Sequence, residues 1–425
     1  MAHIYPYFLP ILTQIIREDI PMNWTQIAIL TMTSTLVMIP LTLLFGFLGE
    51  KIYKWRLLLI GLGYGIVLSH TFIIYFAPNY GMLILAGVIG GIGASIFHPI
   101  ALPLLSQEFG ANRNIAHSFN LIFGTLGSML TPISTIYFSM QVGWRNTSLA
   151  FGIFGVAIFP ILILLLVLAR KEIHYKPHEA VMINKKVVIL NQKNGNKQML
   201  KIVLSLFTGP IIALLAALIV RNGIFKILNT FTALIFVDEY GVDDIKSALI
   251  MSLILALGGI SALISGFISK KVGSLKTYLF SNITTTIAAL AIVLFTSIIT
   301  LTSTTINVGL LVVAILLFSL LSIMFYSGNS PSNALLAEML PLEFVSLING
   351  LLDSLMSSFS IILVVFGKIS DISSFPFEYI LLILFSIIPL ILVFYIKSKV
   401  GYKTPDEIEC AREKDIVACM EAISK

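Results

Sequence analysis

Charged residues are scarce in this sequence: Asp, Glu, Lys and Arg together make up 11% of the 425 residues. A soluble globular domain carries roughly 25%. The stretches 57–107 and 277–337 contain no charged residue at all. Each is long enough for two spanning helices of about 20 residues. The lack of charge therefore predicts an integral membrane protein and argues against a soluble enzyme.

Cysteine and recognisable catalytic motifs are equally scarce. The two cysteines, Cys410 and Cys419, lie in the charged C-terminal segment, and we expect free thiols there. The expected spans contain no His-x-x-x-His pair and no pair of acids, and the chain has no Gly-x-Ser-x-Gly turn and no Gly-Lys-Ser phosphate loop. We therefore expect no metal, no cofactor, no enzymatic activity and no direct use of ATP.

The apolar runs predict an all-α protein with twelve transmembrane helices. The runs do not alternate with period two, as strands of a membrane barrel would. We place the spans at 1–17, 24–48, 57–77, 81–105, 117–139, 147–169, 212–237, 247–268, 277–299, 305–327, 345–367 and 378–396. The start of the chain lacks a basic stretch and an Ala-x-Ala site, so we expect no cleaved signal peptide.

The basic residues follow the positive-inside rule when both termini are placed in the cytoplasm. Most of the 27 Lys and Arg residues then fall in cytoplasmic segments, above all in 170–201 and in the tail. The outer loops carry acids such as Asp238 and Asp243. We therefore expect a multi-pass protein of the cell membrane. Its net charge of +6 suits anionic lipid and gives no reason to expect a nucleic-acid partner.

The chain is organised as two similar halves. We divide it into a six-helix bundle at 1–169, a basic cytoplasmic linker at 170–201, a second six-helix bundle at 202–397 and a cytoplasmic tail at 398–425. Gly46-Phe-Leu-Gly49 recurs as Gly266-Phe-Ile-Ser269. Six spans in each half give a parallel, pseudo-symmetric repeat, which favours a central cavity and alternating access.

The loop between spans two and three carries the clearest motif. The segment Gly46-Phe-Leu-Gly-Glu-Lys-Ile-Tyr-Lys-Trp-Arg56 resembles the G-x-L-[AG]-D-R-x-G-R-[RK] loop of the major facilitator superfamily. Glu50 stands where the family has Asp, and Tyr53 stands where it has Gly. The resemblance implies a conformational latch formed by Gly46, Gly49, Glu50, Lys51, Lys54 and Arg56. A plain positive-inside turn is the alternative.

Two further segments refine the resemblance. Phe97-His98-Pro99 follows a Gly-rich run in span four and is similar to the fosmidomycin-resistance branch, although Ile100 stands where that branch has an acid. Span five contains Gly124-x-x-Gly127-x-x-x-x-Pro132, similar to a motif common in exporters of the superfamily. The resemblance implies a secondary transporter, and the fifth span favours efflux.

Polar residues inside the seventh span are the main candidates for a substrate site. Asn222, Lys226 and Asn229 share one helix face, and Arg221 lies at its edge. Charge inside a membrane is costly and usually functional. We expect this stripe to line the cavity and to attract an anionic or strongly polar solute. The alternatives are that Arg221 extends to the membrane surface and that Lys226 forms an internal ion pair.

Asp353 is the only acid well inside an expected span, and histidines and asparagines supply the remaining candidates. Asp353 could carry a coupling proton or pair with Lys226 or Arg221, and both remain open. His98, His3, Asn329 and Asn333 are further candidates for substrate contact. The alternatives are a histidine bonded to backbone and a polar helix break at a proline.

These observations predict a proton-coupled secondary carrier for a small solute such as an organic anion or a drug-like molecule. The expected partners are the lipid bilayer, the solute and protons, and the expected functional unit is one chain. A non-transporting membrane sensor with the same fold is the alternative, and a membrane-embedded enzyme is a more distant one.

Overall fold

The computed structural model describes residues 4–51, 55–109, 113–172, 207–302, 307–339, 351–352, 354–372 and 379–401. All regular structure in these ranges is helical. The helices are α1 (Ile4–Asp19), α2 (Trp24–Lys51), α3 (Arg56–Tyr75), α4 (Tyr80–Phe109), α5 (Arg113–Glu172), α7 (Gly209–Asp238), α8 (Asp244–Val272), α9 (Ser274–Leu301), α10 (Val308–Tyr326), α11 (Asn329–Met339), α13 (Ile362–Ile372) and α14 (Ile380–Val400), with a 3₁₀ turn (η3) at Phe359–Ile361.

Within the described residues, 10 helical segments are long and apolar enough to cross a membrane. Two local features account for the difference between this number and the twelve predicted spans. α5 contains two predicted spans, which meet at Gly143, where a φ of 81° interrupts the helix. α1 has 16 residues, fewer than a spanning helix usually needs.

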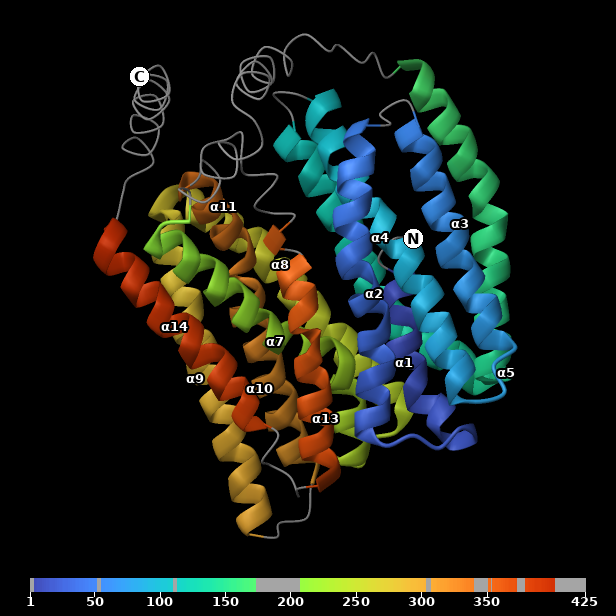
Figure 1. Cartoon of the computed structure of the whole chain (residues 1–425). Coiled ribbons are helices and arrows are strands. Elements are labelled where there is room, and N and C mark those ends of the chain that lie inside the picture. Colours follow the sequence, from blue (N-terminus) through green and yellow to red (C-terminus); the bar gives the residue numbers. More distant parts are fainter. Residues whose placement is uncertain are drawn as a thin grey trace, which may run out of the picture.

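The helices form two groups that lie side by side (Figure 1). α1 to α5 make one half, in which α4 packs on α2 and α3. α7 to α14 make the other half, in which α14 packs on α7 and α9. The halves meet where α2 contacts α13 and where α5 contacts α8. We call the end where α5 finishes and α7 begins the linker end, and the opposite end the far end.

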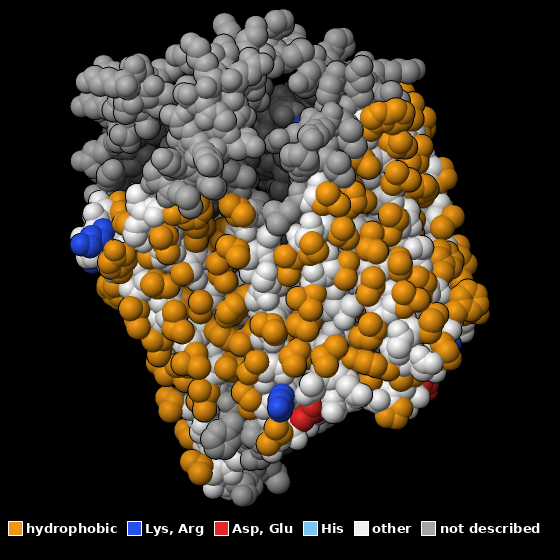
Figure 2. Space-filling view, in the orientation of Figure 1, with side chains coloured by type: hydrophobic (Ala, Val, Ile, Leu, Met, Phe, Trp, Pro, Cys, Tyr) orange, Lys and Arg blue, Asp and Glu red, His pale blue; other side chains and the backbone are white. Residues whose placement is uncertain are grey.

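The sides of the bundle present apolar side chains to the surroundings, as a lipid-facing surface requires. Figure 2 shows hydrophobic side chains covering the visible flank of both halves, with few charged side chains among them. Phe154, Leu294 and Leu316 are each about three-fifths exposed. Such continuous apolar exposure is rare on soluble proteins and is expected in contact with a membrane.

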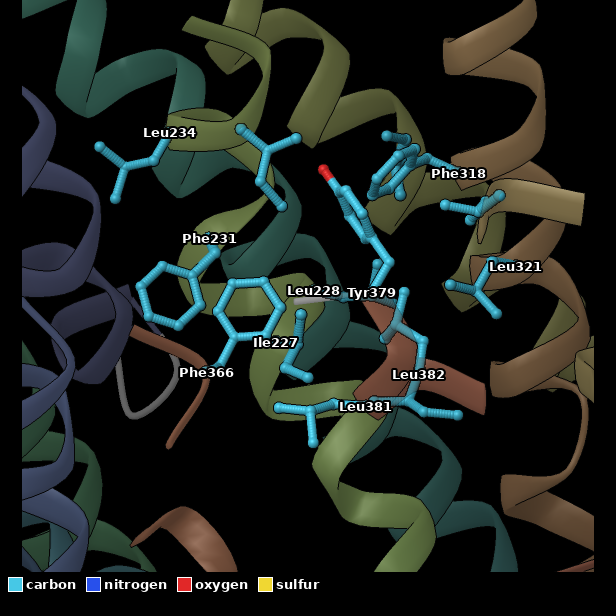
Figure 3. Packing of buried hydrophobic residues seen from close by; sticks show 14 of the residues in the cluster. Ile227, Leu228, Phe231, Leu234, Phe318, Leu321, Phe366, Tyr379, Leu381 and Leu382 are labelled. Carbon is cyan, nitrogen blue, oxygen red and sulfur yellow. The ribbon is translucent and has the colours of Figure 1, made fainter. Parts of the chain in front are cut away.

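The core of the second half is built from aromatic and aliphatic side chains and extends into the first half. Phe231 of α7 stacks on Phe366 of α13 with ring centroids 4.8 Å apart (Figure 3). Trp24, the first residue of α2, lies 5.4 Å from Phe231. Ile27 and Ala28 of α2 belong to the same buried cluster. The two halves therefore share a hydrophobic core near the far end.

The tenth span is broken between α10 and α11, and a buried cation occupies the break. At the end of α10 the Gly328 backbone N–H bonds the Phe325 carbonyl and not the Met324 carbonyl, so the Met324 carbonyl needs other donors. Ser281 donates to the Met324 carbonyl at 2.6 Å. Arg221 donates to the Ser281 hydroxyl at 2.8 Å and to the Phe325 carbonyl. A cation at a helix C-terminus also complements the helix dipole.

The geometry around Arg221 explains a glycine in the break. The Arg221 side chain is 2% exposed, and its guanidinium lies 4.9 Å from the centre of the Phe325 ring. A Cβ atom on Gly328 would collide with the guanidinium, so only glycine leaves room for it. Arg221 therefore points into the second half and does not extend to the membrane surface.

At the far end, α13 holds the first turn of α2 across the two halves. The Asp371 carboxylate accepts hydrogen bonds from the backbone N–H groups of Trp24 at 2.9 Å and Thr25 at 3.0 Å. It also accepts one from the Thr25 hydroxyl at 2.6 Å. One turn earlier, a Cβ on Gly367 would lie 2.6 Å from the Trp24 carbonyl oxygen, so glycine permits this close approach. An acid at a helix N-terminus satisfies groups that the helix itself cannot.

Two further contacts close the far end between α1 and the second half. The Arg17 guanidinium forms a two-bond ion pair with Asp238 at the end of α7. Gln14 donates to the Ser247 hydroxyl of α8 at 2.9 Å. Together with Asp371, these residues join three helix pairs on one side of the molecule, so the two halves are held together at the far end.

Replacing Arg221 is expected to destabilise the second half. Arg221→Met would remove the hydrogen bonds to the Ser281 hydroxyl and the Phe325 carbonyl, at a cost of about 2–3 kcal/mol. The melting temperature of the purified protein should fall clearly, and Gly328→Ala should lower it by displacing the guanidinium. Lys270→Met, at an exposed position at the end of α8, is the control. Equal melting temperatures for Arg221→Met and the control would contradict this role.

Replacing Asp371 is expected to favour opening at the far end. Loss of a helix cap costs about 1 kcal/mol, which shifts a two-state equilibrium roughly fivefold. The measurement is the distance between spin labels at Phe76→Cys and Leu301→Cys, with Cys410 and Cys419 replaced by Ser. Asp371→Asn should enrich long distances, whereas Lys368→Gln, exposed on the same helix, should not. Identical distributions for the two variants would rule the cap out as a closing contact.

Candidate functional site

A cavity of about 210 Å³ lies between the two halves. Its walls come from both halves and are mainly apolar. The lining residues are Pro10 of α1; Thr31, Ser34, Thr35 and Met38 of α2; Ile60, Gly63, Tyr64 and Val67 of α3; Gly93, Ala94 and Phe97 of α4; Phe225, Lys226, Asn229 and Thr230 of α7; and Ser357 and Leu363 beside α13. An apolar pocket with a few polar groups is the usual form of a small-molecule site.

Lys226 is the one charged side chain among the described residues that line this cavity. No hydrogen bond or ion pair joins it to another described residue. Asn229, about one turn later on α7, is itself hydrogen-bonded, because its side-chain amide donates to the Phe225 carbonyl at 2.8 Å. Phe225 itself lies beside the Tyr326 ring, 6.0 Å away. Among the described residues, the second half thus presents an unpaired ammonium group surrounded by apolar and neutral side chains.

The described residues with which the first half lines the cavity include hydroxyl groups and no charged side chain. Thr31, Ser34 and Thr35 are spaced i, i+3 and i+4, so they share one face of α2. Gly91 of α4 allows this stretch of α2 to come close, because a Cβ there would collide with the Ser34 backbone. Polar residues at helical spacing inside an apolar span are a visible signal in the sequence, but these three residues are not among the predicted site residues.

A second, smaller cavity of about 20 Å³ adjoins the first and is lined by His70. Its other walls include Ser34 and Val67, which also line the larger cavity. The His70 ring nitrogen lies 2.5 Å from the Val67 carbonyl oxygen, so the ring is held against its own helix. The volume suits a single water molecule.

The other candidates from the seventh and tenth spans lie away from the cavity wall. Asn222 donates to the Met356 carbonyl at 2.8 Å and so ties α7 to the segment before η3. Arg221 caps α10, as described above. Asn329 begins α11, and Asn333 is exposed on that helix. Of the predicted stripe on α7, Lys226 and Asn229 line the cavity.

Several predicted site residues fall outside the described part of the chain. His3, Asp353 and Lys54 are among them. His98 belongs to α4, next to Phe97 of the cavity wall, but its side chain is also outside the described residues. The same holds for Gly46, Gly49, Glu50 and Lys51, whose backbone forms the last turns of α2. The latch therefore stays a prediction.

Two described contacts bear on the loop motif and its repeat. Arg56, the last latch residue, is buried at the start of α3. In the second half, Ser274 in the corresponding loop donates to the Glu338 carboxylate at the end of α11 at 2.6 Å. Gly266 lies against Ser330 of α11. The loop between α8 and α9 is thus bonded to the broken tenth span.

Comparison with known sequences identifies the family. The profile of the Major Facilitator Superfamily matches residues 5–365. The fosmidomycin resistance protein of Escherichia coli (strain K12) is 24% identical over 135 residues, which is 32% of the length of either chain. The chain thus matches about a third of that relative, in agreement with the resemblance seen at Phe97-His98-Pro99.

Solved structures show the same fold. The xylose transporter XylE from E. coli, in its inward open conformation, aligns with a TM-score of 0.66 over 96% of both chains at 14% identity. A D-xylose-proton symporter aligns with a TM-score of 0.69 over 93% of both chains at 12% identity. These matches confirm the predicted all-α architecture of two six-helix halves, and the family indicates a secondary transporter. The chain belongs to the Major Facilitator Superfamily.

Proposed function

We propose that this chain carries a small organic anion across the membrane by alternating access, with the substrate bound in the cavity between the halves. The observation that carries this proposal is Lys226. It is charged, it lies in the cavity wall, and it has no partner among the described residues. Because both halves of one chain form the cavity, a single chain suffices as the functional unit.

The energetics of an isolated ammonium group favour an anionic substrate. A charge held inside a membrane protein away from water is costly unless it is paired. An anion that binds Lys226 supplies a charge-assisted hydrogen bond, which is about twice as strong as a neutral one. The cavity volume of about 210 Å³ is below the roughly 300 Å³ of ordinary drug sites. A small anion therefore suits the site better than a large drug.

The domain division at 1–169, 170–201, 202–397 and 398–425 supports a rocking motion. In this proposal the two bundles rotate about the cavity, and the linker and tail face the cytoplasm. The far end then faces outward, and Asp371, Arg17 and Gln14 close the outer side. The loop from Gly46 to Arg56 would serve as a latch on the cytoplasmic side.

The direction we propose is efflux. The fifth span contains the Gly124 to Pro132 pattern of exporters, and the E. coli relative is named for resistance to fosmidomycin. Fosmidomycin is a phosphonate, so its acidic group is of the kind that Lys226 would bind. Proton coupling through Asp353 remains part of the proposal. Asp353 lies four residues before Ser357 of the cavity wall, which fits either proton transfer or pairing with Lys226.

A membrane sensor with this fold is the second candidate. It would bind the anion at Lys226 without moving it across the membrane. Binding without flux in the experiments below would favour that function.

Replacing Lys226 should abolish most anion transport. We would reconstitute the protein in liposomes and measure flux of fosmidomycin, other organic anions and sugars. Loss of a charged hydrogen bond costs about 1.5–3 kcal/mol, so Lys226→Ala should lower anion flux roughly 10- to 100-fold, and Lys226→Arg should retain part of it. Lys368→Ala, an exposed lysine of α13, is the control. Full anion flux through Lys226→Ala would refute the assignment.

Replacing Asp353 tests proton coupling separately. In the same liposomes, an imposed pH gradient should accelerate wild-type flux. Asp353→Asn cannot exchange a proton, so it should lose this acceleration while still exchanging substrate across the membrane at equal pH. Retention of full pH-driven flux in Asp353→Asn would remove the coupling role and leave Asp353 as a structural partner.

A further inference from the structure

Three polar side chains share one face of α7 in the cavity wall, and they differ in what each can offer a ligand. Lys226, Asn229 and Thr230 line the cavity and are spaced i, i+3 and i+4, which places neighbouring Cβ atoms about 5–6 Å apart. The Lys226 ammonium can only donate hydrogen bonds, and the Thr230 hydroxyl can donate or accept. What Asn229 can offer depends on the hydrogen bonds that it already makes.

The Asn229 amide nitrogen is hydrogen-bonded within the protein. It donates to the Phe225 carbonyl at 2.8 Å and to the Tyr326 hydroxyl at 3.4 Å. Because a carbonyl oxygen cannot donate, the nitrogen of the amide and not its oxygen must face Phe225. The Asn229 amide is therefore held in one orientation, and its nitrogen has two acceptors for its two hydrogens.

The Asn229 side-chain oxygen is left open to the cavity. No described residue donates to it, and it is not closed off from solvent as the unpartnered Gln14 oxygen is. Asn229 as a whole is only 6% exposed, so a ligand that fills the cavity would take this oxygen out of water. An acceptor that loses water without gaining a donor weakens binding.

The two fixed groups set a requirement on any anion bound at Lys226. An acid group that has acceptor oxygens only can pair with Lys226 but leaves the Asn229 oxygen unsatisfied. An anion with an O–H or N–H within one or two bonds of the acid group satisfies both. A cationic donor is unfavourable, because it would lie within about one helix turn of the Lys226 ammonium.

We propose that Asn229 is a specificity-determining residue, which selects small anions that carry a neutral hydrogen-bond donor beside the acid group. The donor is either a hydroxyl or N–H on the adjacent atom or a proton kept by the acid group itself. In both cases the acid group binds Lys226 and the donor binds the Asn229 oxygen. This inference rests on the proposed function, since it names the class of solute for the same cavity.

Two pairs of ring-bearing acids distinguish the two sources of the donor. The ring suits the cavity wall, where Tyr64 and Phe97 lie with centroids 5.8 Å apart. Mandelate carries a hydroxyl beside its carboxylate where 2-phenylpropionate carries a methyl group. Phenylphosphonate keeps one proton at mildly acidic pH, whereas benzenesulfonate keeps none. Binding to the purified, full-length protein is measured by calorimetric titration at that pH, with each enantiomer of mandelate.

In at least one pair, the acid with the donor should bind roughly fivefold more tightly, as one net hydrogen bond provides. An advantage of mandelate assigns the donor to an adjacent hydroxyl. An advantage of phenylphosphonate assigns it to the proton of the acid group. Either result supports the role of Asn229 when the variants below remove the advantage.

Variants of Asn229 test the acceptor directly. Asn229→Leu keeps the approximate size of the side chain, and Asn229→Ala avoids any crowding by leucine. Both should abolish the advantage within the pair, while the acid without the donor binds as before and so shows that the cavity is intact. Asn146→Leu is the control. The Asn146 amide makes the same bond to a carbonyl one turn back, to Val142 at 2.9 Å, but lies outside the cavity lining.

The outcomes decide the inference without deciding the proposed function. The selective role is overturned if neither acid with a donor binds more tightly than its partner, if none of the four acids binds, or if both Asn229 variants keep the advantage. It is also overturned if these variants weaken both members of a pair equally. Lys226-dependent flux of fosmidomycin or another anion could still occur in each case. Conversely, donor-selective binding with no flux of any solute would support the Asn229 assignment while the transport proposal failed.

Discussion

The structure depends on supplying partners to backbone groups wherever a helix ends or breaks inside the membrane. Lipid offers no hydrogen bonds, so each exposed N–H or C=O needs a donor or acceptor from the protein. Arg221 and Ser281 meet this need at the break between α10 and α11. Asp371 meets it at the start of α2. The first pairing stabilises one half, and the second joins the two halves at the far end.

Against this background, Lys226 differs from the other buried cation. Arg221 bonds the Ser281 hydroxyl and carbonyls of α10 through one guanidinium nitrogen, Nη2, and its flat group lies against the Phe325 ring. Lys226 lies in a cavity wall, and the described residues around it offer no anion. The same helix therefore carries one cation that is hydrogen-bonded to described residues and one that has no partner among them. Thr31, Ser34 and Thr35 of α2 line the wall of the same cavity in the other half.

The sequence was informative about the fold because the membrane imposes a simple rule on composition. Uncharged stretches located most helices to within a few residues, and the polar stripe on α7 pointed to Lys226 and Asn229. Sequence reasoning did not show that Arg221 and Lys226 lie in different surroundings, because both are basic residues at similar depth and the partners of Arg221 lie on other helices. It also missed Asp371. Asp371 looked like an ordinary loop acid, and its role depends on the N-terminus of a helix almost 350 positions away.

The most direct test of Lys226 as the anion-binding group is chemical restoration of its charge. In a background with Cys410 and Cys419 replaced by Ser, Lys226→Cys should transport anions poorly in liposomes. Reaction with aminoethyl methanethiosulfonate places an amine near the original position and should restore much of the anion flux, whereas the neutral methyl reagent should not. Equal flux after both reagents, or full flux through unmodified Lys226→Cys, would contradict the account.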